Sequence, residues 1–266
     1  LAGIKAGDIL IEIDGQSIID FRFDEVILMV RGPEGTTVNL KFLREGVEDP
    51  LEFSIVRTRF EVPTVEFEVL PQEIAGDATI GYIRLTEFNS NAEERLLEAL
   101  DALLDEDITG LVFDLRDNPG GFLDQSVAVA DAFLPDGVAL FERNIRGLDE
   151  TFRTDDGDVA ETIPLVVLVN SGSASASEIV AGAIQDRDRA VLVGETTFGK
   201  GSVQQIHPLS DGSELRVTIA RWYTPGNHTI DGVGIVPDIE VATPEDLGGQ
   251  EDGQLARAVE FLLKGQ

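Results

Sequence analysis

From residue 76 onward the chain alternates between short apolar runs and amphipathic segments, and this alternation strongly constrains the fold. Residues 110–115 and 165–169 are largely apolar, and each run is followed by helical spacing of apolar residues, at 125–133 and 178–185. A strand that is apolar on both sides is buried on both faces of its sheet, and helices between such strands form crossovers. The sequence therefore predicts an α/β core.

The other elements expected in this core follow the same alternation. Residues 93–104 place five leucines at helical spacing, which predicts an amphipathic helix. Residues 142–162 are polar and acidic, and we interpret them as a surface excursion. Further strands and a closing helix are expected at 80–85, 190–193, 215–222 and 255–263.

The first 57 residues have a different pattern, with short strands around one helix. The expected strand, helix and two further strands lie at residues 9–13, 23–30, 38–43 and 51–56. The helix stops at Gly32-Pro33, because neither residue continues a helix well. Residues 58–75 contain Pro63 and Pro71 and show little periodicity, so we expect a linker there.

The net charge argues against two classes of partner. The 266 residues include 50 acidic and 20 basic ones, which gives a formal charge of −30. Nucleic acid and anionic membrane surfaces would be repelled. The absence of cysteine excludes disulfides and thiolate chemistry. Because the chain begins at Leu1, without Met, we expect it to be part of a longer polypeptide. No apolar run approaches 18 residues, so we expect no membrane span in this part.

Lysine is rare in this chain, since only four occur and Lys200 is the only one between Lys41 and Lys264. A buried lysine can lose its proton and act as a base, whereas arginine stays charged in a protein. Lys200 is therefore a candidate base, with a solvated surface lysine as the alternative. The segment is not a good phosphate-binding loop, because Gly201 stands where Ser or Thr should follow the lysine.

Two loops that follow apolar strands carry residues suited to acyl transfer. Ser175 and Glu178 fit a helix capping box, which is a structural explanation for this serine. A serine at a helix N-terminus also lies beside free backbone N–H groups that can stabilise an oxyanion. The other loop, Asp117-Asn118-Pro119-Gly120-Gly121, has the composition of a turn, and a glycine N–H there could donate a second oxyanion hydrogen bond.

The usual hydrolase signatures are absent from the sequence. There is no Gly-x-Ser-x-Gly elbow and no His-Glu-x-x-His zinc motif. Two histidines, His207 and His228, leave a Ser-His-Asp triad open, although each lies beside turn residues.

Taken together, these blocks resemble the carboxy-terminal processing peptidases, or tail-specific proteases, of the serine-lysine type. Residues 1–57 resemble the second half of a PDZ domain, so the resemblance covers essentially the whole chain. The blocks that carry it lie at 2–10, 14–15, 31–32, 115–121, 172–183, 194–201, 211–213, 223–225 and 232–238. The carboxylate-binding loop and peptide-pairing strand of such a PDZ domain would precede Leu1, so this part is not expected to hold a peptide carboxylate.

The resemblance implies which residues carry the chemistry. In the family the nucleophilic serine precedes the lysine by 25 residues, which selects Ser175 over Ser173 and Ser177 (175 to 200). Neutral Lys200 would take the proton from Ser175, and Gln204 would position the lysine. A free lysine, with a pKa near 10.4, is neutral in only about one molecule in two thousand at pH 7. Burial of Lys200 is therefore expected.

The rest of the site also follows from the resemblance. The oxyanion hole would be the backbone N–H groups of Ala176 and Gly121, with Gly120 as the alternative to Gly121. Peptide hydrolysis would proceed through an acyl-enzyme, and no metal or cofactor is required.

The implied fold class is α/β, a partial PDZ domain followed by a crotonase- or Clp-protease-like peptidase core. The expected domains are the partial PDZ domain at 1–57, a linker at 58–75 and a serine peptidase domain at 76–266. The implied function is an extracytoplasmic endopeptidase that cleaves proteins at or near apolar C-terminal tails; a homo-oligomer is compatible with the sequence. One alternative is a PDZ-type peptide-binding protein without turnover. Another is an enzyme acting on acyl thioesters on a related scaffold, in which Ser175 and Lys200 would be superfluous.

Overall fold

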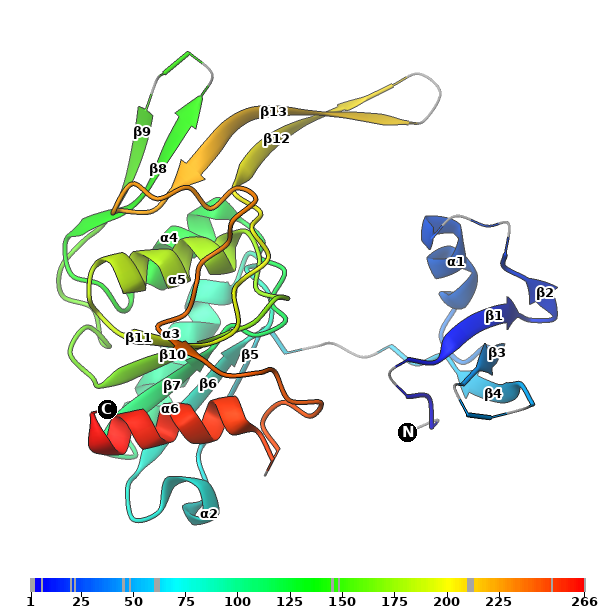
Figure 1. Cartoon of the computed structure of the whole chain (residues 1–266), viewed down its shortest axis with the longest axis horizontal. Coiled ribbons are helices and arrows are strands. Elements are labelled where there is room, and N and C mark those ends of the chain that lie inside the picture. Colours follow the sequence, from blue (N-terminus) through cyan, green and yellow to red (C-terminus); the bar gives the residue numbers. More distant parts are fainter. Residues whose placement is uncertain are drawn as a thin grey trace. The chain divides into compact units, whose positions relative to one another are not determined.

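The structure is a computed structural model. It describes residues 3–5, 7–19, 21, 23–44, 46–47, 49–59, 63–144, 146–147, 149–209, 213–249 and 251–265. The chain forms two compact units, residues 1–62 and 63–266, which are described separately (Figure 1). Parts of two sequence blocks, at residues 2, 6 and 211–212, lie outside the described residues.

The first unit is a four-stranded antiparallel sheet with one helix. Its elements are β1 (Ile9–Ile13), β2 (Gln16–Ser17), α1 (Phe23–Val30), β3 (Thr37–Leu43) and β4 (Leu51–Val56), with strand order β2-β1-β3-β4. Alternate residues of β3 are buried, because successive side chains of a strand point to opposite faces. Val38, Leu40 and Phe42 thus form a small core with Ile13.

The main sheet of the second unit has six strands in the order β14-β11-β10-β7-β6-β5. The strands are β5 (Val65–Val69), β6 (Ile80–Leu85), β7 (Gly110–Asp114), β10 (Leu165–Val169), β11 (Val191–Gly194) and β14 (Ile239–Glu240). All neighbouring pairs are parallel except β5 with β6, at one edge. The apolar runs at 110–115 and 165–169 are the two central strands, which confirms the predicted α/β core.

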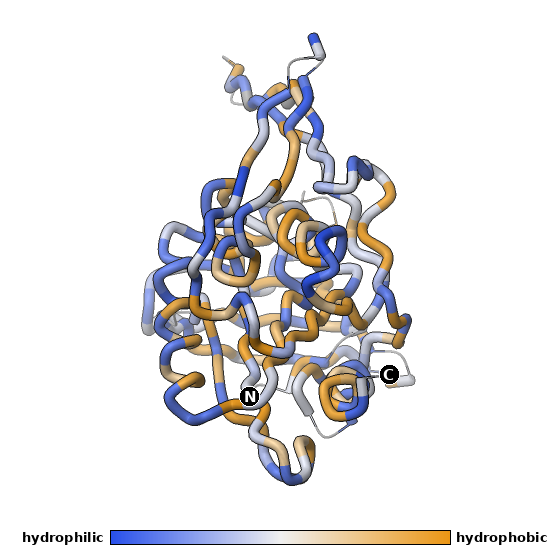
Figure 2. Tube along the Cα trace, turned by 90° about the vertical axis from the view of Figure 1, so that its left-hand side faces the viewer, coloured by the Kyte–Doolittle hydropathy of each residue, from blue (hydrophilic) through white to orange (hydrophobic). Residues whose placement is uncertain are grey.

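Helices cover both faces of this sheet (Figure 1). The helices are α3 (Ala92–Leu104), α4 (Leu123–Asp131) and α5 (Ala176–Asp186) on one face, and α2 (Gln72–Ala75) and α6 (Gly253–Lys264) on the other. Along β10, Val167 and Val169 belong to the first apolar cluster, whereas Val166 and Leu168 belong to the second. Figure 2 shows this apolar interior along the central strands and helices. No helix in the described part of the chain is long and apolar enough to cross a membrane.

The segment 58–75 differs from the linker that we expected. From residue 63 it belongs to the second unit, where β5 pairs with β6 and is followed by α2. The sequence Val65-Glu66-Phe67-Glu68-Val69 alternates as an edge strand should. Pro63 and Pro71 flank this strand without interrupting its pairing, so their presence did not indicate a structureless segment.

A second sheet, in the order β12-β13-β8-β9, lies beside α4 and α5. Its strands are β8 (Gly137–Asn144), β9 (Asp149–Thr154), β12 (Ser202–Pro208) and β13 (Glu214–Tyr223), so the excursion expected at 142–162 includes part of this sheet. β12 and β13 pair as a long antiparallel ribbon, here called the arm (residues 202–209 and 213–223), which projects beyond the helices at the top of Figure 1. Trp222 at its base is buried, whereas Leu215 and Val217 further out are exposed.

Candidate active site

Three loops meet at the carboxyl ends of neighbouring parallel strands. They follow β7, β10 and β11 and comprise residues 115–122, 170–175 and 195–201. Loops at this end of adjacent parallel strands converge, although they are far apart in the sequence. Backbone hydrogen bonds join them: Ala174 N–H donates to Asn118 O (3.0 Å), and Phe198 N–H donates to Ser173 O (3.0 Å). The three blocks that were singled out for chemistry therefore form one site.

Ser175 lies on a strained turn between β10 and α5. It immediately precedes α5 and has φ 58° and ψ −111°, a backbone conformation that non-glycine residues rarely adopt. Such strain collects at functional sites, and a sharp strand-to-helix turn also presents the nucleophile of α/β-hydrolases. The Gly-x-Ser-x-Gly pattern is absent, but the backbone makes a comparable turn.

The neighbouring serines have structural roles. Ser173 Oγ donates to Leu115 O (2.7 Å), and Ser177 Oγ donates to Asn118 O (2.9 Å); both side chains are fully buried. Ser175 is 6% exposed, and its hydroxyl donates to no atom in the described part of the chain. Of these three serines, Ser175 has the hydroxyl that is free to react.

The glycine loop is pressed against the Ser175 turn. Gly120 has φ +99°, and a Cβ there would lie 2.7 Å from Ser175 Cβ and 2.9 Å from Ala176 N. Only glycine fits this position without displacing the backbone of the turn. Asn118 fixes the loop, because its Oδ1 accepts from Gly120 N–H (2.9 Å) and its Nδ2 donates to Leu85 O (2.8 Å).

Among the residues that the structure describes, the backbone N–H groups of Gly121 and Ala176, beside Ser175, have no hydrogen-bond acceptor. The Gly120 N–H is used by Asn118, whereas the Gly121 N–H has no acceptor among the described residues. Ala176 is the first residue of α5, where an N–H group has no acceptor within the helix. Of the two glycines considered for the oxyanion hole, the geometry favours Gly121.

Glu178 joins the serine turn to the lysine loop, a role that the sequence analysis missed. Its side chain is fully buried, and Oε2 accepts from the N–H groups of Ser175 and Lys200, both at 2.8 Å. Oε1 accepts from Gly199 N–H (2.7 Å) and from the Thr197 hydroxyl (2.6 Å). Four donors compensate for burying this carboxylate. The capping-box position of Glu178 was the available sequence signal, but it indicated only the bond to Ser175.

Lys200 has a fixed backbone and an exposed side chain. Its N–H is held by Glu178, and Gly201 is packed so closely that a Cβ there would lie 2.3 Å from Asp231 N. Among the described residues, no hydrogen bond joins Lys200 Nζ to Ser175 Oγ, and the Lys200 side chain is exposed. The expected burial of Lys200 is therefore not found in this conformation, because the close loop contacts fix its backbone and leave its side chain in solvent.

Gln204 lies on the arm. It belongs to β12, is exposed, and pairs with Thr218 of β13 next to a register shift between Val203 and Gln204. No hydrogen bond joins its side chain to Lys200 in the described part of the chain. The structure thus brings the candidate nucleophile and oxyanion donors together, but leaves the side chains of Lys200 and Gln204 outside that cluster.

Neither histidine is positioned as the base of Ser175. His228 Nδ1 lies 3.2 Å from Asp186 Oδ1, and Asp186 is the last residue of α5. Since Ser175 precedes the first residue of this 11-residue helix, the two ends are about 16 Å apart at 1.5 Å per residue. His207 is exposed on the arm.

A buried charge cluster fixes the start of the glycine loop. Arg116, fully buried, contacts Asp114 (2.6 Å) and Asp252 (2.8 Å), the residue that caps α6. Tyr82 donates to Asp114 Oδ2 (2.6 Å), and burial together with this carboxylate raises the pKa of Tyr82 well above its ordinary value. Removing one partner would leave a buried charge uncompensated, so the cluster holds the start of the loop in one place.

Comparison with known proteins identifies similar peptidases. The profile described as "Peptidase family S41" matches residues 79–241, and that of a PDZ domain matches residues 1–44. A carboxyl-terminal-processing protease of Synechocystis sp. is 39% identical over 268 residues, which cover 99% of this chain and 62% of that protein. A carboxy-terminal-processing protease of Bartonella bacilliformis is 42% identical over 249 residues, 91% of this chain and 56% of that protein.

A solved structure is similar over nearly the whole chain. The photosystem II D1 C-terminal processing protease aligns with a TM-score of 0.70 and 32% identity, over 97% of this chain and 68% of that one. The chain spans less than two thirds of the length of the Synechocystis and Bartonella relatives. The family match covers more than half of the chain, and the fold agrees with it, so this chain belongs to peptidase family S41.

Proposed function

We propose that this chain is the catalytic part of a serine endopeptidase that cleaves proteins at or near their C-terminal tails. Ser175 is the nucleophile, Lys200 is the general base, and Gln204 positions the lysine. The observation that carries the proposal is the strained Ser175 turn, whose free hydroxyl lies beside the unpaired N–H groups of Gly121 and Ala176 among the described residues. Acyl transfer needs this combination of nucleophile and oxyanion donors.

In the proposed reaction, Ser175 Oγ attacks the scissile carbonyl carbon while neutral Lys200 Nζ takes the hydroxyl proton. The carbonyl oxygen becomes an oxyanion that accepts hydrogen bonds from Gly121 and Ala176 N–H. The C–N bond then breaks, and the lysine ammonium returns the proton to the leaving nitrogen. A water molecule, deprotonated by Lys200, hydrolyses the acyl-enzyme and restores Ser175.

Movements of two side chains must precede this reaction. The Lys200 backbone is already tied to Glu178, so the Lys200 side chain turns towards Ser175, and Gln204 moves to contact the lysine. A bound peptide would exclude water from the ammonium group, and desolvation favours the neutral form of lysine. Catalytic hydrogen bonds often tighten only when substrate is bound, which agrees with the open arrangement here.

The substrate class belongs to the same proposal. The Synechocystis and Bartonella relatives are named as carboxy-terminal-processing proteases, which supports protein tails as substrates. Apolar tails, an extracytoplasmic location and a homo-oligomer remain predictions, and the charge of −30 argues against nucleic acid as a partner.

Replacement of the nucleophile tests the proposal. We expect Ser175→Ala to lower hydrolysis of an unstructured protein with an apolar C-terminus by at least about ten-thousandfold, because no other group can form the acyl-enzyme. Wild-type protein should also be labelled covalently at Ser175 by a fluorophosphonate. Ser54→Ala in the first unit is the control and should keep full activity. Undiminished proteolysis by Ser175→Ala would refute the mechanism.

The second candidate is a peptide-binding protein without turnover, which the exposed Lys200 favours. It predicts that tail peptides bind while wild-type protein neither cleaves them nor reacts with the fluorophosphonate. Binding measured by fluorescence anisotropy, combined with a cleavage assay on the same peptide, separates the two functions.

A further inference from the structure

Two phenylalanines beside the candidate active site are unusually exposed. Phe198 is 67% exposed and Phe122 is 57% exposed, the two highest values among the phenylalanines whose exposure the structure describes. Single exposed apolar residues are common on protein surfaces and need no explanation. The informative fact is that these two rings lie in two of the three loops that form the site.

The backbones of both residues are held by hydrogen bonds close in sequence to the candidate catalytic residues. Phe122 directly follows Gly121, and its N–H donates to Phe88 O (2.8 Å). Phe198 lies two residues before Lys200, and its N–H donates to Ser173 O (3.0 Å), two residues before Ser175. The rings are thus attached to fixed backbone on the glycine loop and the lysine loop, while their side chains remain uncovered.

We propose that Phe122 and Phe198 determine specificity by contacting the substrate side chains on the two sides of the scissile bond. The inference rests on the proposed function. Gly121 N–H would bind the carbonyl oxygen of the residue before the bond, so the ring on the next residue lies near that side chain. Lys200 must reach the leaving nitrogen, so Phe198 lies near the residue after the bond.

This assignment indicates which substrate side chains are preferred on the two sides of the cleaved bond. Covering a phenyl ring with an apolar side chain removes apolar surface of both from water, which favours binding. The enzyme therefore prefers apolar residues on both sides of the cleaved bond. Acidic residues at these positions would meet apolar rings and the field of a strongly negative protein, so they are disfavoured.

The test measures selectivity with the full chain and a panel of peptides that carry Ala, Leu or Asp before or after one cleavage site. Phe122→Ala should reduce the Leu-over-Ala preference in kcat/KM about tenfold at the position before the bond only. Phe198→Ala should do the same only at the position after it. Phe122→Leu and Phe198→Leu should restore most of the preference, because an apolar side chain remains.

Phe67→Ala is the matched control, because Phe67 is 48% exposed but lies on the edge strand β5. It should leave both preferences unchanged, and all variants should keep the wild-type Tm because the replaced rings are exposed. Unchanged selectivity in both alanine variants, with Ser175-dependent cleavage intact, would overturn this inference alone. An exchange of the two positions would overturn the assignment of sides. Absence of cleavage by wild-type protein would instead refute the proposed function.

Discussion

The two halves of the candidate site differ in how they are held. The nucleophile side, residues 117–121 and 170–178, is largely buried, and the side chains of Asn118, Ser173, Ser177 and Glu178 are hydrogen-bonded. The base side, residues 199–204, has only its first part held: Gly199 and Lys200 donate backbone N–H groups to Glu178, while the side chains of Lys200 and Gln204 are exposed.

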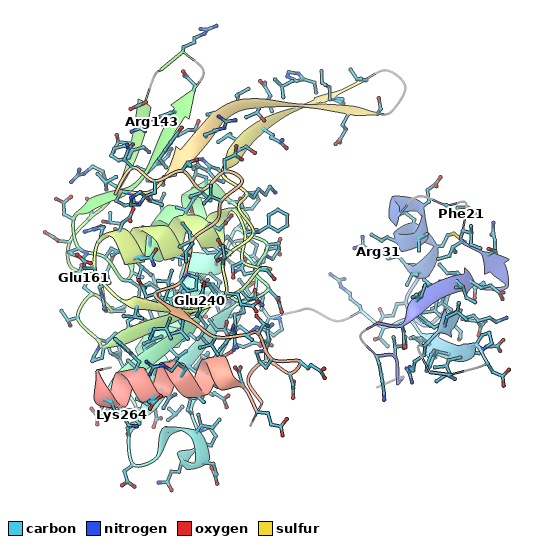
Figure 3. The ribbon with its side chains drawn as sticks, in the orientation of Figure 1. Phe21, Arg31, Arg143, Glu161, Glu240 and Lys264 are labelled. Atoms are coloured by element: carbon cyan, nitrogen blue, oxygen red, sulfur yellow. The ribbon has the colours of Figure 1, made fainter. Side chains whose placement is uncertain are left out.

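This difference indicates which side of the candidate site can change its conformation. A buried, satisfied network has one favourable arrangement, because any shift leaves a polar group unpaired. An exposed lysine loses little by moving. The arm that follows it is anchored at its base, where Arg143 lies 4.4 Å from the ring centroid of Tyr223 (Figure 3). We therefore expect the nucleophile side to be preformed and the base side to be completed by substrate.

Among the variants that test this difference between the two sides, Lys200→Arg should lower kcat the most. Arginine keeps the positive charge but cannot serve as a base near neutral pH, so kcat should fall about a thousandfold. The Tm should stay unchanged, because the side chain is exposed. Lys264→Arg is the control: Lys264 is an exposed lysine at the end of α6, away from the arm (Figure 3), and this change should leave kcat unaltered. Wild-type activity in Lys200→Arg would exclude Lys200 as the base.

Gly120→Ala should damage the nucleophile side directly. The new Cβ would lie 2.6 Å from Ala174 O and 2.7 Å from Ser175 Cβ, so the Ser175 turn must shift. We expect kcat/KM to fall about a hundredfold, as misplacement by about 1 Å does in other enzymes. Gly76→Ala separates strain from crowding, because Gly76 also has positive φ (+64°) but a Cβ there would meet nothing within 4 Å. It should lower stability slightly and leave peptide cleavage intact. Equal losses of activity in both variants would contradict the argument.

Glu178→Gln should weaken the connection between the two sides. The amide nitrogen cannot accept hydrogen bonds, so donors that now meet the carboxylate would lose their acceptor. We expect the free energy of unfolding to fall by about 1–3 kcal/mol and kcat to fall about tenfold. Urea unfolding and peptide hydrolysis measure the two effects. Glu94→Gln, an exposed change in the first turn of α3, is the control. If Glu178→Gln matches that control in both stability and activity, Glu178 does not connect the nucleophile side to the base side.

The smallest expected effect is a difference in amide hydrogen exchange between α5 and the arm, measured without any mutation. Amide hydrogen exchange should be slow in the buried residues of α5 and faster in the exposed outer part of the arm, because local opening costs little where few side chains are packed. A covalently bound peptidyl inhibitor should slow exchange at residues 199–205 while α5 changes little. Equal protection of α5 and the arm in the free protein would show that both sides are preformed.

Much of the fold was predictable because its signals are local. The apolar runs at 110–115 and 165–169 required burial on both faces, and they are the central strands. The strand at 65–69 was missed because neighbouring prolines suggested a linker, although its alternation was present. In the site, spacing and family resemblance pointed to Ser175, Lys200 and the glycine loop. Glu178 was identified only as a helix cap, since its other three donors come from residues 197–200.

By itself the sequence determined the α/β class and the order of most strands and helices along the chain, which follow from hydrophobic periodicity. The resemblance to the peptidase family, carried by motifs along the chain, indicated Ser175, Lys200 and the glycine loop as the site. Only the tertiary structure decided that the Ser173 and Ser177 hydroxyls are occupied, that Gly120 N–H is used by Asn118, and that Lys200 is exposed. Each of these depends on which loop lies against which, because hydrogen bonds and burial are set by neighbours in space.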